Sequence, residues 1–566
     1  MTAKRWTIRK HGHERVNQFA RELAVKPIIA ALLIARGYDT PEKAEAFLTP
    51  SLKHLHNSFL LKGMREAVTR IQRAVKDGEK ILIWGDYDVD GTTGTVLLRR
   101  VFNLLGVDSE YHVPNRFTEG YGVNIPALEA AQNRGVSLVI TVDCGIRSFE
   151  PLEWAKENSL DVIVTDHHLS DEVRGNPPAF AVVNPNQTGC EYPDKHLAGV
   201  GVAYKLADAL LREAGLESEI PGFLKIAAIG TVADVMDLTG ENRAIVAIGL
   251  KDLPLTDNSG LRALMEVADC TSEMTSYHIG FRIGPRINAA GRMDVARHVV
   301  ELLEETDFVR ARQLASLLDS RNRERQQTQQ KITELAFSEA ADHADSKFIV
   351  AAGEGWHRGV IGLAASRIAD KLYRPTIVLS IEDGIAQGSA RSIPGFHVLE
   401  ALEAAQDLFE QFGGHRAAAG MKIRSERIPE LRKRLSDYAD TVLRPEDLEP
   451  ELHIDAVLLP ESIDLKLVSA LSSLEPFGQG NPKPIFVTKN LILREDVFVM
   501  KEKHLKLKLE SESGCQFEAV WWDGVDRSKG RTPRRGSRIE LAYVVEVNNW
   551  QGNRKIQLVV EDFREA

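Results

Sequence analysis

The sequence contains little cysteine and no long run of apolar residues. Its four cysteines, at positions 144, 190, 270 and 515, are scattered, and no Cys-x-x-Cys pair occurs. This spacing argues against a thiolate zinc site and against a disulfide framework, and it is typical of a reducing compartment. The first residues lead into no apolar segment of the signal-peptide kind, and no run reaches the roughly 18 apolar residues of a membrane span. We therefore expect a cytoplasmic protein without a membrane segment.

An excess of positive charge is also lacking. The 566 residues include 71 Lys and Arg against 81 Asp and Glu, which gives a formal net charge of −10. A basic surface over the whole molecule is therefore not expected, although a local basic channel for nucleic acid is compatible with this total. The composition is that of a globular protein, and the length indicates about three or four domains.

Three carboxylates follow a short apolar run early in the chain. Residues 81–84 are typical of a buried parallel strand, and residues 92–105 have the periodicity of a helix. Asp86, Asp88 and Asp90 stand on alternate positions between the two elements. Ligands of α/β proteins bind at this edge of the sheet, and carboxylates this close together are tolerated if they are hydrated, protonated or bridged by cations.

The same carboxylates have two other interpretations. Asp-x-Asp-x-Asp-Gly also begins the calcium loop of an EF-hand, but that loop needs Glu six residues after its Gly, where this chain has Leu97. A strand rather than a helix also precedes the motif. The second alternative is a plain acidic turn, which this stretch alone does not exclude.

Strands and helices continue to alternate after this motif, which predicts a parallel sheet with helices on both faces. Residues 137–143 form a second apolar strand that ends on Asp143, and residues 161–166 form a third that ends on Asp166, before His167 and His168. Parallel strands place their carboxyl ends on one edge, so these side chains should converge. Carboxylates and imidazoles without thiolates suit divalent ions such as Mn²⁺ or Mg²⁺. A further candidate ligand is Asp234, at the end of an apolar helix-like segment, although a solvated helix end would look the same.

Several segments have the composition of phosphate-binding loops. We predict a glycine-rich loop at residues 282–294, with Arg286, Asn288 and Arg292 as candidate phosphate contacts, because the guanidinium fork suits phosphate oxygens. A purely structural loop is the alternative. Farther along, Ser389 and Arg391 lie in a stretch of small residues, and Gly413-Gly414-His415 allows a close backbone approach, either to phosphate or in tight packing.

The remaining patterns give the domain organisation. A long amphipathic helix, polar all round near its middle, is expected at about 307–340 and marks a domain boundary. After a second α/β domain, short strands predict a small OB-like barrel. Residues 483–555 carry 15 Lys and Arg against 10 Asp and Glu, and Trp521, Trp522 and Trp550 lie among them, either to stack on single-stranded nucleic acid or to fill the core.

The predicted boundaries are a helical segment at 1–62, a catalytic α/β domain at 63–300, a connecting helix at 301–344, a second α/β domain at 345–448 and a barrel at 449–566.

These features together predict two-metal hydrolysis of a phosphodiester. Six motifs then follow one another along the chain: Asp86-Tyr-Asp-Val-Asp-Gly, Val142-Asp-Cys-Gly, Asp166-His-His, Leu197-Ala-Gly-Val-Gly-Val-Ala, Gly230-Thr-Val-Ala-Asp and Gly413-Gly-His. The triplet Asp166-His-His resembles the signature of the DHH phosphoesterase superfamily, and the ordered set resembles the single-strand-specific DNA exonucleases of that superfamily over nearly the whole chain.

The resemblance implies a 5′–3′ exonuclease that degrades single-stranded DNA to 5′-mononucleotides in repair and recombination. It implies a DHH domain, a DHHA1-like domain, Mn²⁺ or Mg²⁺, and two ions. Single-strand-binding protein and a helicase would be partners, and the chain would act as a monomer. Asp88, Asp90, Asp143, His167 and Asp234 would be metal ligands, with Asp166 and His168 at the same centre and Asp86 beside it. Arg292, Ser389, Arg391 and Gly413-Gly414-His415 would hold the DNA backbone.

The chain departs from the superfamily at one ligand position, because Trp84 stands where many relatives have His. Proteins with two other functions could carry the same motifs. One is hydrolysis of short oligonucleotides or cyclic dinucleotides, for which a basic barrel would be unnecessary. The other is a DNA-binding scaffold without catalysis, whose mark would be lost carboxylates.

Overall fold

A computed structural model describes residues 4–116, 118–270, 272–292, 296–341, 343, 345–528, 530–550 and 553–565. The chain forms two compact units. Unit 1 comprises Met1–Pro41, Arg325–Ser473 and Lys483–Ala566, and unit 2 comprises Glu42–Glu324 and Leu474–Pro482. Among the described helices, none has the length and apolarity that crossing a membrane requires.

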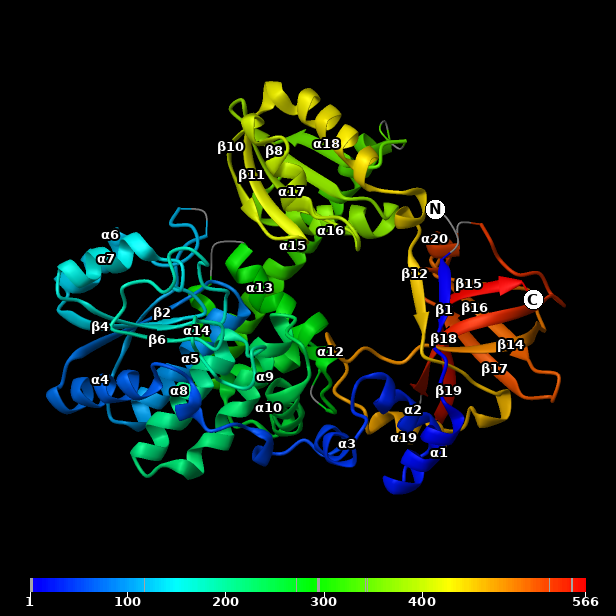
Figure 1. Ribbon diagram of the computed structural model, residues 1–566, viewed down its shortest axis with the longest axis horizontal. Helices are drawn as coiled ribbons and strands as arrows, with labels where there is room; N and C mark the ends of the chain where they lie inside the picture. The colour runs from blue at the N-terminus through cyan, green and yellow to red at the C-terminus, as the bar shows by residue number, and fades with distance from the viewer. Residues whose placement is uncertain are drawn as a thin grey trace. The chain divides into compact units, whose positions relative to one another are not determined.

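Unit 2 is built on a five-stranded sheet in which all neighbouring strands are parallel (Figure 1). This confirms the parallel sheet that the alternating pattern predicts. The strand order is β3-β2-β4-β5-β6, so the two apolar strands β2 and β4 lie at or next to its centre. The strands are β2 (Lys80–Gly85), β3 (Glu110–His112), β4 (Val136–Val142), β5 (Asp161–Thr165) and β6 (Ala181–Val183).

Helices cover both faces of this sheet because successive strand side chains point to opposite sides. In β2, Ile81 and Ile83 belong to a large core with helices from one face, whereas Leu82 and Trp84 pack with helices from the other. The first face carries α4 (Met64–Asp77), α5 (Val89–Leu104), α8 (Gly199–Glu213), α9 (Leu224–Ala233) and α10 (Gly240–Asp252), and the second carries α6 (Ile125–Asn133) and α7 (Phe149–Glu157).

The predicted glycine-rich loop at 282–294 is wrong over residues 282–292, which are helical, and residues 293–294 lie outside the described residues. The helical segment follows α12 (Ser276–His278) and comprises η5 (Ile279–Ile283), a π-helical turn, and α13 (Gly284–Arg292). Pro285 is the second residue after the π-helical turn, inside a helical stretch that is continuous from Ser276 to Arg292. Gly291 serves packing instead of a turn, since a Cβ there would lie 2.5 Å from the carbonyl oxygen of Tyr87. α11 (Ser259–Val267) and α14 (Arg297–Glu304) complete the helices of this region.

The long helix predicted at about 307–340 is present as α15 (Phe308–Ala341). Its first part buries Ala311, Ala315 and Leu318 in the core of unit 2, and its second part buries Ile332 and Ala336 in a core of unit 1. In unit 1 it is followed by a sheet of order β10-β11-β9-β8-β7 with α16 (Arg358–Leu372), α17 (Val398–Glu403) and α18 (Ile428–Val442). The strands are β7 (Ile349–Glu354), β8 (Thr376–Glu382), β9 (Ile385–Arg391), β10 (Phe409–Gly414) and β11 (Ala418–Arg424).

The C-terminal strands form a seven-stranded sheet in which β14 also pairs with β16, as in a small barrel. Trp521 is part of the core, packed on Phe563, whereas Trp522 is exposed beside His504. The side chain of Trp550 lies outside the described residues. The strands are β13 (Ala456–Val457), β14 (Phe486–Leu493), β15 (Phe498–Met500), β16 (His504–Glu510), β17 (Gln516–Trp521), β18 (Arg538–Trp550) and β19 (Asn553–Glu565).

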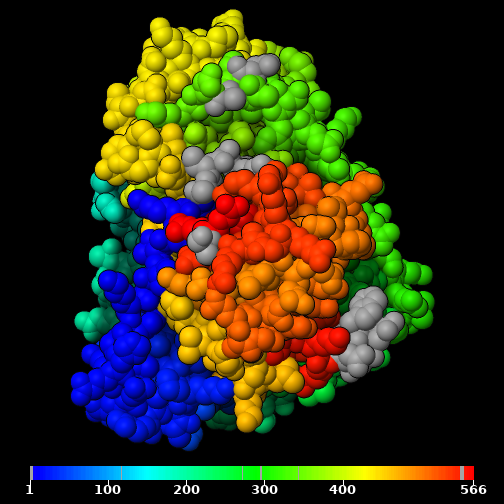
Figure 2. Space-filling view, turned by 90° about the vertical axis from the view of Figure 1, so that its right-hand side faces the viewer, coloured from blue at the N-terminus to red at the C-terminus, as the bar shows by residue number. Residues whose placement is uncertain are grey.

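The N-terminal segment contains a strand that the sequence does not reveal. β1 (Arg5–Ile8) pairs in parallel with β12 (Glu451–Ile454), and Figure 2 shows the blue N-terminal residues beside the orange and red C-terminal ones. The helices expected after it are present as α2 (Pro27–Ala35) and α3 (Pro41–Leu48), preceded by α1 (His13–Glu22).

Candidate metal centre and substrate cavity

The ends of four parallel strands lie in register at one edge of the unit 2 sheet. Gly85 pairs with Val142, Val142 with Thr165, and Thr165 with Val183. The next residues along the chain, Asp86, Asp143 and Asp166, are therefore neighbours in space, as the strand pattern predicts.

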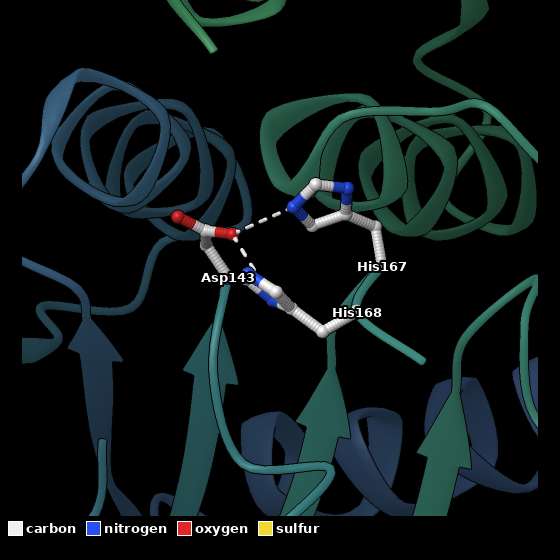
Figure 3. A group of neighbouring side chains, drawn as sticks. All are labelled: Asp143, His167 and His168. Carbon is white, nitrogen blue, oxygen red and sulfur yellow. Dashed lines mark ion pairs between the residues drawn. The ribbon is translucent and has the colours of Figure 1, made fainter. Parts of the chain in front are cut away.

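Seven of the eight predicted ligands lie in three overlapping groups, within each of which the ligand atoms are no more than 4.8 Å apart. Asp143 belongs to two groups and His167 to two. Figure 3 shows one group, in which Asp143 Oδ1 lies 3.1 Å from His167 Nε2 and 3.9 Å from His168 Nδ1. The groups are Asp143, His167 and His168; Asp90, His167 and Asp234; and Asp86, Asp88 and Asp143.

Helix termini position the carboxylates of this cluster. Asp88 is the N-cap of α5 and accepts a hydrogen bond from the backbone N–H of Gly91 at 3.1 Å. Asp90, two residues later, accepts 2.6 Å hydrogen bonds from the N–H groups of Gly199 and Val200, at the N-terminus of α8. The positive end of the α8 dipole favours the ionised form of Asp90. Gly199 has no room for a side chain, because its Cβ would lie 2.6 Å from Cβ of Asp143.

Asp234 follows the last residue of α9, and its Oδ2 lies 3.6 Å from His167 Nε2. A distant segment, residues 474–482, supports the loop after it. The N–H of Leu238 donates to the carbonyl of Gln479 at 2.8 Å, and the buried Arg243 donates from Nη2 to the carbonyl of Glu475 at 2.7 Å. We refer to residues 474–482 as the C-terminal anchor of unit 2.

The carboxylates raise one another's pKa. Burial, and then the neighbouring Asp88, raise the pKa of Asp90 to about 7. Burial, and then Asp90, raise the pKa of Asp234 to about 9. The pKa values of Asp86 and Asp143 also lie well above the ordinary value, with burial as the main cause. Without a counter-charge this cluster therefore retains protons, and a bound cation would replace them.

Unsatisfied atoms show that the cluster fits a divalent ion. Asp143 Oδ1 and His167 Nε2 are buried and have no hydrogen-bond partner among the described residues. Burial lowers the pKa of His167 to about 4, so its ring is neutral. The ring also hydrogen-bonds the backbone of Leu197, and because Nε2 has no partner, Nδ1 makes this bond. His167 Nε2 and Asp143 Oδ1 are thus two acceptors 3.1 Å apart, an arrangement that a cation between them would satisfy.

Asp166, also predicted at the metal centre, lies outside the three groups and holds His168 in place. Its Oδ1 accepts from the N–H groups of His167 at 2.7 Å and His168 at 3.1 Å, and contacts His168 Nδ1 at 2.8 Å. Its Oδ2 accepts from the N–H of Ile146 at 2.9 Å. Burial lowers the pKa of His168, but the bond to Asp166 outweighs this effect and raises it to about 9.

Trp84 contributes no ligand to the centre. Its indole is fully buried, packs on His112 with 4.3 Å between ring centroids, and has an N–H without a partner among the described residues. An indole N–H donates but does not accept, so it cannot replace the imidazole of the relatives.

A cavity of about 360 Å³ opens beside the carboxylates. Two of the three residues predicted to bind phosphate from the segment 282–292 line it, Asn288 and Arg292. Arg286 does not, because it pairs with Asp319 of α15 at 2.9 Å. The full lining is Asp86, Tyr87, Asp88, Arg116, Tyr121, Ala233, Asp234, Val235, Asn288, Gly291 and Arg292.

Among the residues of this lining that the sequence interpretation missed, three carry polar side-chain groups: Tyr87, Arg116 and Tyr121. The Arg116 guanidinium lies 5.1 Å from the centroid of the Tyr87 ring, and the Tyr121 hydroxyl donates to the carbonyl of Asp143 at 3.1 Å. Arg116 and Tyr121 come from the loop Asn115-Arg-Phe-Thr-Glu-Gly-Tyr-Gly, whose basic and aromatic composition was the available signal.

The other predicted DNA contacts lie together in unit 1. Ser389 pairs with Gly420 across β9 and β11, and Gly420 pairs with Gly413 of β10, so these residues form one row. Arg391 Nη1 donates to Ser389 Oγ at 2.9 Å. Gly413 and Gly414 end β10, and His415 begins the turn to β11, where its N–H donates to the carbonyl of Ala418 at 2.8 Å. Their contact with DNA stays a prediction.

Comparison with known proteins accounts for most of the chain. Residues 80–231 match the DHH family, N-terminal domain; residues 345–441 match the DHHA1 domain; and residues 454–562 match the RecJ OB domain. The single-stranded-DNA-specific exonuclease RecJ of Bacillus subtilis is 40% identical over 99% of this chain and 70% of its own. The RecJ of Escherichia coli is 34% identical over 95% of each chain.

Solved structures agree with these matches. RecJ of Thermus thermophilus in complex with Mn²⁺ superposes with a TM-score of 0.85 at 30% identity, covering 99% of this chain and 80% of that one. Its complex with Mg²⁺ gives a TM-score of 0.80 at 30% identity, covering 99% and 78%. The predicted fold class, two α/β domains and a C-terminal OB-like barrel, is thereby confirmed. The chain belongs to the RecJ family of single-stranded-DNA-specific exonucleases.

Proposed function

We propose that this chain is a metal-dependent exonuclease that degrades single-stranded DNA from the 5′ end to 5′-mononucleotides, in DNA repair and recombination. The observation that carries this proposal is the buried pair of unsatisfied acceptors, Asp143 Oδ1 and His167 Nε2, inside a cluster of four further carboxylates. Family membership supports the substrate and the direction of digestion.

The ligand groups would suit two ions. Asp90, His167 and Asp234 would hold one ion, and Asp86, Asp88 and Asp143 would hold the other. Mn²⁺ and Mg²⁺ both suit this oxygen-rich set. When bound, such ions lower the pKa of a water molecule and stabilise the attacking and leaving oxygens of the phosphodiester.

The protein's own side chains bind and orient the strand. The imidazolium of His168, kept charged through its Nδ1 bond to Asp166, places positive charge beside the carboxylate cluster and would contact a phosphate oxygen. Arg116 and Arg292 line the same cavity and would pair with phosphates, and Asn288 would donate to them. These contacts supply affinity separately from the carboxylates, which hold the ions.

Other parts of the assignment extend this proposal. We infer that Ser389, Arg391 and Gly413-Gly414-His415 hold the DNA backbone, and that the barrel binds strand farther from the cleaved end. The boundaries 1–62, 63–300, 301–344, 345–448 and 449–566 are our proposed division into domains. We further propose that the protein acts as a monomer in the cytoplasm, on strands that a helicase supplies and single-strand-binding protein covers.

Digestion of labelled oligonucleotides by wild type and by Asp143→Asn tests the function. The wild type should release mononucleotides from single strands with Mn²⁺ or Mg²⁺ and none with EDTA. Asp143→Asn should bind the same strands but not cleave them. Cleavage by Asp143→Asn at the wild-type rate would contradict the assignment of the metal centre, and hydrolysis of dinucleotides alone would favour a small-substrate hydrolase.

A further inference from the structure

We propose that Tyr277 and Phe281 form a platform on which bases of the single-stranded substrate stack, two or three nucleotides from the catalytic carboxylates. This inference rests on the proposed function, since it assumes a single-stranded nucleic acid as the ligand. It assigns a base-binding subsite to two residues that belong neither to the metal-ligand groups nor to the lining of the cavity.

The two rings are stacked and open to solvent. Their centroids are 4.9 Å apart with an interplanar angle of 24°, and the residues are 55% and 70% exposed. Stacked rings with free faces are the arrangement that proteins use for binding single strands without sequence preference, because every base has a π face. Two exposed aromatic side chains that stack on each other form a small apolar patch, which indicates a binding surface more than a single exposed apolar residue does.

The helical segment that carries the two rings leads to the substrate cavity. η5 packs on the end of α9: a Cβ on Gly280 would lie 3.9 Å from Cγ1 of Val232, and the next two residues, Ala233 and Asp234, line the cavity. η5 continues into α13, whose Asn288 and Arg292 also line the cavity. From Phe281 to Asn288 the helical rise is roughly 10 Å, the length of about two or three nucleotides in a single strand.

The platform is held rigidly. Thr275 and His278 cap α12, with the N–H of Thr275 donating to His278 Nδ1 at 3.1 Å. Ser276 Oγ donates to the carbonyl of Phe477 in the C-terminal anchor of unit 2. The π-helical turn at η5, a feature frequent at functional sites, sets the position of Phe281. Rings fixed in this way would lose little entropy when a base stacks on them.

The test uses the full-length protein and a 5′-phosphorylated strand of twelve thymidines. Dissociation constants are measured by fluorescence anisotropy in EDTA, and KM and kcat are measured with Mn²⁺. Phe281→Ser should raise both the dissociation constant and KM roughly five- to tenfold, the effect of one lost stack, whereas Phe281→Trp should retain wild-type values. Leu255→Ser, which changes an 82% exposed residue of the same unit outside the cavity lining, is the matched control and should change neither value.

Strands with one abasic site distinguish stacking from a general structural effect. If Phe281 stacks on a base, removing the base at the second, third or fourth position should weaken binding to the wild type about as much as Phe281→Ser does. The same abasic strand should cause no further loss in the variant. Additive losses at every position, or unchanged binding by Phe281→Ser, would overturn the platform.

The two proposals fail in different ways. If the wild type binds the strand but does not cleave it, the exonuclease assignment fails while the anisotropy data still decide the platform. The other outcome is that the wild type cleaves single strands normally and Phe281→Ser has the same dissociation constant, the same KM and the same loss of affinity for abasic strands. In that case the platform fails and the exonuclease assignment stands. That second result would leave a protein partner as the occupant of the exposed rings.

Discussion

The metal-free protein should become less stable as the pH rises, and Asp234→Asn should remove much of this effect. The pKa of Asp234 in the folded state is raised from 3.8 to about 9, by burial first and by Asp90 and Asp88 next. Between these two values the folded protein keeps the proton while the unfolded chain releases it. The free energy of the unfolded state therefore falls relative to that of the folded state as the pH increases, and stability decreases throughout this window.

The size of the effect follows from proton linkage. A group that is protonated in the folded state and ionised in the unfolded state contributes a loss of about 1.4 kcal/mol per pH unit. Between pH 6 and 8 the limit for Asp234 is thus about 3 kcal/mol, and because its side chain is 26% exposed we expect a value on the order of 2 kcal/mol. Asp234→Asn should be more stable than the wild type at pH 8 by a similar amount, although it should not cleave DNA.

Thermal unfolding in EDTA at pH 6, 7 and 8 measures this difference. Asp257→Asn is the matched control, because Asp257 is an exposed carboxylate on the same unit. Added Mn²⁺ should reverse the trend for the wild type, since the ion replaces the retained protons and its apparent affinity rises with pH. Equal pH slopes for wild type and Asp234→Asn, or lower stability of Asp234→Asn at every pH, would refute the reasoning.

Three further substitutions test other parts of the structure. Asp166→Asn should weaken Mn²⁺ binding roughly 10- to 100-fold in calorimetry, because Asp166 orients both histidines through their N–H groups; unchanged affinity would contradict that role. Arg116→Ala should raise KM for single strands and lower the salt dependence of binding by about one counterion, and an unaltered salt slope would exclude a phosphate contact. Arg243→Met should lower the free energy of unfolding by about 2–4 kcal/mol, because the buried guanidinium donates to the carbonyls of Phe47 and Glu475; a melting temperature equal to that of the wild type would show that the C-terminal anchor is dispensable.

The convergence of the metal cluster was predictable because it depends only on where each carboxylate stands relative to the strand before it. Each of Asp86, Asp143 and Asp166 follows an apolar strand, and the rule that parallel strands end on one edge brings them together without knowledge of the packing. The finer roles were not predictable. Asp166 turns its oxygens to backbone N–H groups and His168, which only the path of the loop after β5 (Asp161–Thr165) decides.

Features that depend on distant parts of the chain escaped the sequence interpretation. β1 (Arg5–Ile8) is a strand because it pairs with β12, more than 400 residues away. Arg286 has the composition of a phosphate ligand, but the approach of α15 gives it Asp319 as a partner. Arg116 and Tyr121 reach the cavity because their loop folds over the sheet edge, and no local pattern sets that path. The segment 282–292 was predicted as a loop from its glycines, whose purpose is close packing.

The most direct test of the account is digestion of a 5′-end-labelled DNA strand, single or paired, with Mn²⁺, Mg²⁺ or EDTA, by wild type and Asp90→Ala. We predict that the wild type releases the label as a mononucleotide from the single strand, and only with metal. Asp90→Ala should leave the strand intact, because Asp90 both belongs to the ligand cluster and joins α5 to the N-terminus of α8. Release of label in EDTA, release from the duplex at the single-strand rate, or cleavage by Asp90→Ala would contradict the account.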